Sequence, residues 1–200
     1  MKKIIILIPI FNDWESFNKL INEIDVNIKD YQNIDFECIL VNDASITGQP
    51  KLIKPNNIKS LQILNMKANR GHARCNAFGI RYIFKNKEFD NIILMDGDGE
   101  DRPVEIKSLI EKIIQNPNIS VVAKRVKRSE GPLFQFLYQI HKIITYIFTG
   151  KKINFGNYSC LIKKDVEKIY SDASLWSSYS GTVKKNLKEI GEIDSIRGLR

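Results

Sequence analysis

Four acidic residues lie within six positions of the chain, directly after a short apolar run. The run covers residues 92–95, and the acids are Asp96, Asp98, Glu100 and Asp101, with Gly97 and Gly99 between them. Carboxylates held this close raise one another's pKa, and a divalent cation relieves the repulsion. Oxygen ligands on a flexible loop suit Mg²⁺ or Mn²⁺, which usually retain water and bridge to phosphates. The segment therefore predicts a cation site with a diphosphate as co-ligand.

A second interpretation treats the same segment as a solvated loop that caps a helix beginning near Pro103. Carboxylates do favour a helix N-terminus, but one or two of them are enough for capping. The EF-hand pattern does not fit, because its ligand spacing continues to an acidic residue at about position twelve of the loop. The number of acids thus favours the cation site.

Phosphate groups need partners of their own, and the familiar phosphate-binding loops are absent from the sequence. Neither a Walker A segment nor a G-x-G-x-x-G turn occurs. The remaining candidates are the cation itself, a helix N-terminus near Gly71, and the side chains of Arg70 and Arg74. Composition alone leaves open that Arg74 is an ordinary surface arginine.

The elements that must position these groups follow an α/β pattern. Short apolar runs predict strands over residues 4–8, 36–41, 60–64, 91–95 and 120–123. Apolar residues at helical spacing predict helices over residues 14–28, 73–84 and 106–114. Alternation of this kind indicates a mostly parallel sheet flanked by helices.

Polar residues follow the predicted strands, at the edge where such sheets bind ligands. Asn12 and Asp13 come after the first strand, and Asn42, Asp43 and Ser45 after the second. Because the acidic segment follows the fourth strand, we expect all three groups to converge.

Charge is distributed unevenly along the 200 residues, which carry a net charge of +8. Residues 1–118 are balanced, whereas residues 119–200 hold 15 basic and 7 acidic side chains. The excess predicts an anionic partner on one side of the molecule. For Lys163, Lys164, Lys184 and Lys185 a solvated surface is an equal alternative. The three cysteines are too widely spaced to predict a disulfide framework or a zinc site.

Two apolar segments bear on localisation. The first, residues 4–10, contains Pro9 and lacks a small-residue cleavage site, so we expect a cytoplasmic protein. The second, residues 133–148, predicts a helix that is too short and polar to span a bilayer. It has basic flanks and could lie at an anionic membrane surface, although packing on the sheet is the alternative.

Six blocks in order resemble family 2 of the inverting glycosyltransferases. They are IPIFND at residues 8–13, VNDAS at 41–45, NRGHARCNAFGI at 69–80, MDGDGEDRPVEI at 95–106, KRVKRSE at 124–130 and FGNYS at 155–159. The last two are similar to motifs of the branch that includes dolichyl-phosphate mannose synthase and bacterial polyprenyl-phosphate glycosyltransferases. The resemblance implies a GT-A fold, Rossmann-like, that binds a nucleotide-diphosphate sugar through a D-x-D metal motif.

The resemblance also implies roles for individual residues. The residues implied to bind the donor nucleotide are Pro9, Phe11, Asn12, Asp13, Asp43, Ser45, Gly71, Arg74, Asp96 and Gly97. Asp43 would accept a hydrogen bond from the N–H edge of uracil or guanine, which implies a UDP- or GDP-linked sugar. Asp96, Asp98 and Glu100 would hold Mg²⁺ or Mn²⁺. Asp98, Arg125 and Arg128 would be catalytic, the two arginines facing phosphates. Ser159 departs from the branch, which usually has an arginine there.

A single domain is expected, with a donor half over residues 1–118 and an acceptor half over residues 119–200. The family's hydroxyl-acceptor enzymes often carry a Glu-Asp pair well after the D-x-D motif, and none follows residue 101. A phosphate nucleophile needs no general base, so this favours a polyprenyl phosphate or surface-glycan intermediate as acceptor at the inner membrane face. The alternatives are a sugar-nucleotide nucleotidyltransferase, an inactive partner subunit and a nucleic-acid-binding module. We expect no nucleic-acid partner, because no recognition motif accompanies the basic residues.

Overall fold

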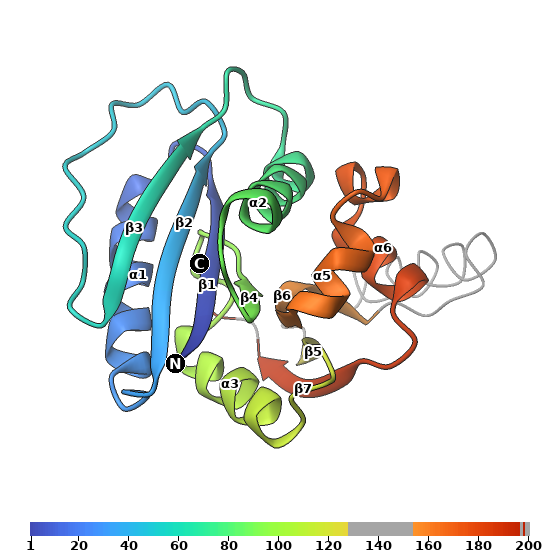
Figure 1. The fold of residues 1–200 in the computed structure, drawn as a ribbon. Helices are drawn as coiled ribbons and strands as arrows, with labels where there is room; N and C mark the ends of the chain where they lie inside the picture. Colours follow the sequence, from blue (N-terminus) through green and yellow to red (C-terminus); the bar gives the residue numbers. More distant parts are fainter. Residues whose placement is uncertain (128–153, 197, 199–200) are drawn as a thin grey trace.

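The computed structural model describes residues 1–127, 154–196 and 198, and they form one seven-stranded sheet flanked by helices (Figure 1). The strands are β1 (Lys2–Ile10), β2 (Ile34–Asn42), β3 (Ile58–Asn65), β4 (Asn91–Leu94), β5 (Val121–Lys127), β6 (Phe155–Ile162) and β7 (Gly191–Ile196). Their order across the sheet is β3-β2-β1-β4-β6-β5-β7. Only β6 runs antiparallel to its neighbours, β4 and β5. The expected α/β class with a mostly parallel sheet is confirmed.

Helices cover both faces of this sheet. They are α1 (Trp14–Ile28), α2 (His72–Asn86), η1 (Pro103–Glu105), α3 (Ile106–Gln115), α5 (Lys163–Ile169), η2 (Ala173–Trp176) and α6 (Tyr179–Asn186). Figure 1 shows α1 on one side of β2 and β1 and α2 on the other. Side chains alternate accordingly along β1: Ile6 joins the core formed with α1 and α3, whereas Leu7 joins the core formed with α2, α5 and α6.

The five predicted strands are present, with ends that differ by a few residues. Two further strands, β6 and β7, were not among the predictions. β6 pairs with β4 through Asn91 and Ile162, residues that are far apart in the chain. β7 lies at the edge of the sheet and alternates exposed with partly buried positions over most of its length. Both strands exist because of pairing partners distant in sequence, which a local apolar pattern does not reveal.

The topology brings the candidate residues to one edge of the sheet. β1, β2, β4 and β5 all end there, since Ile10 pairs in parallel register with Asn42, and Leu7 with Leu94. β6 runs the other way, so its first residues, from Phe155, begin at this same edge. The end of β7 joins them, because Arg125 is in register with Ser195.

Two expectations fall on residues that the structure does not describe. They concern Arg128 and the helix over residues 133–148, both of which lie outside the described ranges. Within the part of the chain that is described, every helix is too short or too polar to cross a bilayer.

Candidate functional site

Asp96 follows β4, separated from it by Met95, and two side chains from other elements hold its carboxylate. His72 Nε2, at the start of α2, lies 2.8 Å from Asp96 Oδ1. Asn157 Nδ2, on β6, donates to the same oxygen at 3.1 Å. Burial raises the pKa of Asp96, but the hydrogen bonds and the charges of His72 and Arg125 lower it overall. Asp96 is therefore kept ionised.

Asp101 stabilises the other end of the acidic segment. Its Oδ2 accepts a hydrogen bond from the Asp96 backbone N–H at 2.9 Å, which closes residues 96–101 into a loop. Tyr158 Oη, on β6, donates to the carbonyl of Arg102 at 3.0 Å and secures the loop's far side. Burial and the charge of Asp96 raise the pKa of Asp101 to about 7. Like charges thus crowd this loop, as the sequence predicts.

Asp98 and Gly97 lie between these two anchors. Asp98 Oδ1 accepts from the Glu100 backbone N–H at 3.1 Å. Gly97 packs on β1, and a Cβ there would lie 2.8 Å from the Pro9 carbonyl oxygen, so any larger residue would displace the loop. Among the described residues, no three His, Cys, Asp or Glu side chains converge tightly enough to form a metal centre. That Asp96, Asp98 and Glu100 bind a cation remains a prediction.

Arg125 of β5 acts electrostatically on the acidic loop from the part of the chain that follows residue 118. Its positive charge lowers the pKa of both Asp96 and Asp101. Gly156 on the neighbouring strand makes room for it, since a Cβ there would lie 2.8 Å from Arg125 Nη2. A guanidinium and several carboxylates therefore share this edge of the sheet.

The loops after β1 and β2 are bonded to each other. Asn12 has a φ of 58°, a left-handed conformation that asparagine tolerates. Its backbone N–H donates to Ser45 Oγ at 2.8 Å, and its Oδ1 accepts from the Ile46 N–H at 2.8 Å. Asp13 is the N-cap residue of α1, and Phe11 beside it is 44% exposed. Asn12 and Ser45 thus shape the loops, while Phe11 presents an apolar face to solvent.

Asp43 connects the end of β2 to the start of α2. Its two carboxylate oxygens accept the backbone N–H groups of Arg70 and Gly71, each at 2.8 Å. Gly71 has a φ of 87°, which favours glycine, and Arg74 is exposed on the first turn of the helix. The Cys75 thiol also hydrogen-bonds this buried carboxylate, so a nucleotide base would have to use one of its remaining lone pairs.

The structure assigns contacts to two residues that the sequence did not single out, His72 and Asn157. Both occur inside blocks quoted above, His72 in NRGHARCNAFGI and Asn157 in FGNYS. Their shared contact with Asp96 joins α2 and β6, segments 85 positions apart. For His72, the sequence signal that could have identified it was a polar side chain next to the predicted start of a helix. Ser159 lies fully buried on β6, where its hydroxyl is 2.6 Å from Tyr179 Oη.

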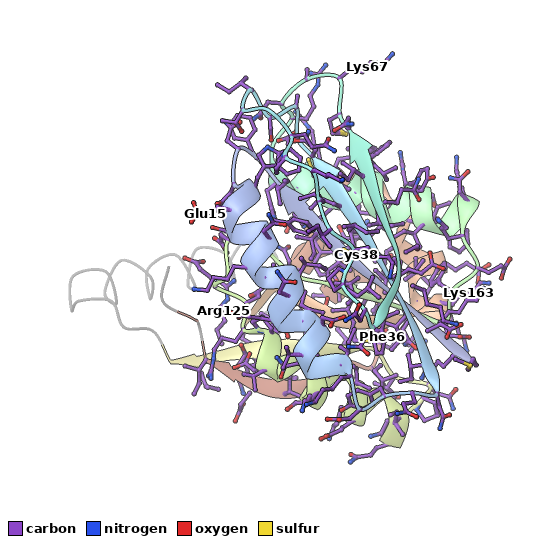
Figure 2. The ribbon with its side chains drawn as sticks, turned by 90° about the vertical axis from the view of Figure 1, so that its left-hand side faces the viewer. Glu15, Phe36, Cys38, Lys67, Arg125 and Lys163 are labelled. Carbon is purple, nitrogen blue, oxygen red and sulfur yellow. The ribbon has the colours of Figure 1, made fainter. Side chains whose placement is uncertain are left out.

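Some lysines of the basic segment, residues 119–200, lie away from the edge of the sheet that carries the acidic loop. The Lys163 backbone N–H donates to the carbonyl of Asp90, which precedes β4, at the opposite end of the sheet. Figure 2 shows Lys163 and Arg125 on opposite sides of the molecule. Lys163 also pairs with Glu88 at 3.4 Å, and Lys185 with Asp172 at 3.1 Å. For these two lysines the structure favours the solvated-surface alternative.

With this geometry in place, comparison with known proteins decides the family. The model of the family described as "Glycosyl transferase family 2" matches residues 5–177. The chain belongs to glycosyltransferase family 2. The family assignment agrees with the resemblance carried by the six sequence blocks, and it makes the chain a transferase domain.

Curated relatives of this family 2 chain are undecaprenyl-phosphate 4-deoxy-4-formamido-L-arabinose transferases. Those of Proteus mirabilis (strain HI4320) and Salmonella choleraesuis (strain SC-B67) are 24% and 25% identical over 164 residues. Each alignment covers 82% of this chain and 48% of the relative. The chain thus spans about half the length of the curated relatives it matches.

Solved structures of glycosyltransferases share the fold. S. aureus TarS 1–349 in complex with UDP is 16% identical, with a TM-score of 0.61 over 98% of this chain and 60% of that one. Glucosyl-3-phosphoglycerate synthase from Mycobacterium tuberculosis, in complex with Mn²⁺, UDP and phosphoglyceric acid, is 11% identical. Its TM-score is 0.62, over 100% of this chain and 71% of that one. At these identities the likeness establishes the GT-A fold alone.

Proposed function

We propose that this family 2 domain is a metal-dependent inverting transferase that moves a sugar from a nucleotide-diphosphate donor to a polyprenyl phosphate or a surface-glycan intermediate. The observation that carries the proposal is the position of Arg125, whose charge acts on both Asp96 and Asp101. An anion-binding guanidinium beside cation-binding carboxylates suits an acceptor phosphate held next to a cation-bound donor diphosphate.

The acidic loop fits Mg²⁺ or Mn²⁺ in its chemistry. All the donor atoms are oxygens, and burial together with the charges of Asp96 and Asp98 raises the pKa of Asp101 to about 7. Asp96, Asp98 and Glu100 are the residues that would hold the ion. When bound, such an ion would offset the charge that develops on the departing nucleoside diphosphate. The Mn²⁺ bound by the mycobacterial synthase supports this assignment.

Donor binding falls to residues 1–118 in this proposal. The loop of Pro9, Phe11, Asn12 and Asp13 and the buried Asp43 would contact the nucleoside. Ser45 would support that loop through its bond to Asn12. Gly71 and Arg74, at the start of α2, would face the diphosphate with Asp96 and Gly97. UDP or GDP is the expected nucleotide, and the UDP complex of TarS supports the first.

Acceptor binding falls to residues 119–200, where Arg125 and Arg128 would orient a phosphate through bidentate contacts. An acceptor phosphate is already ionised, so its oxygen can attack the anomeric carbon without a general base. Attack opposite the leaving diphosphate inverts the anomeric configuration. The undecaprenyl-phosphate acceptor in the relatives' name supports this substrate class. It would place the domain at the inner face of the plasma membrane, in peripheral contact through residues 133–148.

The test separates donor binding from transfer. Isothermal titration with UDP- and GDP-sugars is run with Mn²⁺ and then with EDTA, and nucleotide release is followed with and without undecaprenyl phosphate. We expect cation-dependent binding of one donor class and release stimulated by the lipid phosphate, with an inverted anomeric configuration in the product's NMR spectrum. Absence of any cation-dependent donor binding would contradict the proposal.

A further inference from the structure

The last described residue of the chain lies against the acidic loop. The Gly198 backbone N–H donates to the carbonyl oxygen of Glu100 at 2.8 Å. A Cβ on Gly198 would lie 2.7 Å from the Gly99 carbonyl oxygen, a backbone atom that cannot turn aside. Residue 198 can therefore approach the loop this closely only because it is a glycine.

The strand before Gly198 is fixed to the same region by Glu105 of η1. Ser195 Oγ donates to Glu105 Oε2 at 2.6 Å, and the Ile196 backbone N–H donates to Glu105 Oε1 at 2.9 Å. Arg102 Nη1 lies 3.6 Å from Glu105 Oε1 and helps to orient this carboxylate. The contacts of Glu105 with β7 and of Gly198 with Glu100 are called the C-terminal clasp below.

Glu100 connects the clasp to Asp98. Its carbonyl accepts from Gly198, while its own N–H donates to Asp98 Oδ1 at 3.1 Å. A displacement of the Glu100 backbone would therefore change the position of the hydrogen bond that orients the Asp98 carboxylate. The loop contains two glycines, which have more conformational freedom than other residues, so contacts from other elements help to fix its backbone.

We infer that the C-terminal clasp positions Asp98 for the cation and the donor diphosphate, with Gly198 and Glu105 as positioning residues. The inference rests on the proposed function and goes beyond it, because neither residue belongs to the donor, metal or acceptor sets. Partners that orient a metal ligand typically change metal affinity 10- to 100-fold when they are altered. The clasp thus makes residues 195–198 a determinant of donor-site geometry.

The test compares three glycine variants in Mn²⁺ titrations monitored by electron paramagnetic resonance of the free ion, with UDP present. Gly198→Ala should bind Mn²⁺ about tenfold more weakly than the wild type. Gly48→Ala, where a Cβ would meet nothing within 4 Å, should match the wild type. Gly79→Ala, whose Cβ would lie 2.4 Å from the Leu7 side chain in the core, should lower the melting temperature but not the Mn²⁺ affinity.

A second variant and a second readout guard against a merely structural effect. Glu105→Gln keeps one acceptor oxygen, so it should weaken Mn²⁺ binding by less than Gly198→Ala does. In hydrogen exchange on the cation-free protein, Gly198→Ala should speed exchange at the Glu100 amide and leave the β1 amides protected. Equal Mn²⁺ affinity in folded Gly198→Ala and wild type would overturn the clasp alone. Failure of the wild type to bind Mn²⁺ would overturn the proposed metal dependence, and the clasp inference with it.

Discussion

His72 and Asp96 form an ion pair at the edge of the sheet where the parallel strands end, with Nε2 and Oδ1 2.8 Å apart. Burial lowers the pKa of His72, but the hydrogen bond and charge of Asp96, with Asp101 and Asp98, raise it overall. The pair holds the start of α2 against the acidic loop. It also places a protonatable group on the first residue of the proposed metal motif.

We expect His72→Gln to lose stability in a pH-dependent way. A histidine whose pKa is higher in the folded than in the unfolded protein stabilises the fold fully at pH values below its unfolded-state pKa. This stabilisation is lost as the pH rises through its folded-state pKa. The pKa of Asp96 is lowered instead, so the stabilisation that it contributes is lost as the pH falls into the acid range. The loss should be about 0.5–1 kcal/mol at pH 5–6, because His72 is nearly half exposed, and smaller at pH 8. Urea unfolding in EDTA measures it; a loss that grows with pH would contradict the pair.

Asp101 should make the wild type less stable as the pH approaches neutrality. Its pKa is about 7 in the folded protein and lower when unfolded, so the folded state binds the extra proton between about pH 4 and 7. The free energy of unfolding should therefore fall by on the order of 1 kcal/mol per pH unit between pH 5 and 7. Asp101→Asn keeps an acceptor for the Asp96 N–H and should flatten this dependence. Parallel pH profiles for the two proteins in EDTA would rule the effect out.

Asp98→Asn should abolish cation-dependent turnover while leaving the fold intact. The substitution keeps the side chain's shape and the acceptor for the Glu100 N–H, but it removes a charge that a cation needs. We expect a loss of about 100-fold or more in kcat, with an unchanged far-UV circular dichroism spectrum. Asp30→Asn is the matched control, since Asp30 is a surface residue that pairs with Lys107 at 3.6 Å. Turnover retained in Asp98→Asn would remove this residue from the metal site.

Arg125→Met should weaken binding of the phosphate acceptor more than that of the donor. The variant loses the guanidinium that faces the acidic loop, so the KM for undecaprenyl phosphate should rise about tenfold or more. Lys124→Met changes the adjacent position on β5, where the side chain pairs with Glu192 at 3.6 Å, and should leave that KM unchanged. A KM raised equally in both variants would indicate a general effect of strand charge.

The sequence alone determined which polar residues lie together at one edge of the sheet. Buried parallel strands end together, so the polar residues that follow them lie at one edge, as Asn12, Asp43 and Asp96 do. The acidic loop could also be predicted without tertiary information, because its four carboxylates lie within six positions of the chain. The six ordered blocks were enough to indicate the family that the comparison with known proteins then established.

Only the tertiary structure decided what surrounds that chemistry. Pairing of β6 between β4 and β5 brings Asn157 to Asp96, and the edge strand β7 carries Gly198 to Glu100. Neither approach leaves a local pattern, because hydrophobic periodicity reports which side of an element is buried and not which distant element covers it. The free energy that selects those partners comes from burying the shared core and satisfying backbone hydrogen bonds of strands far apart in the sequence.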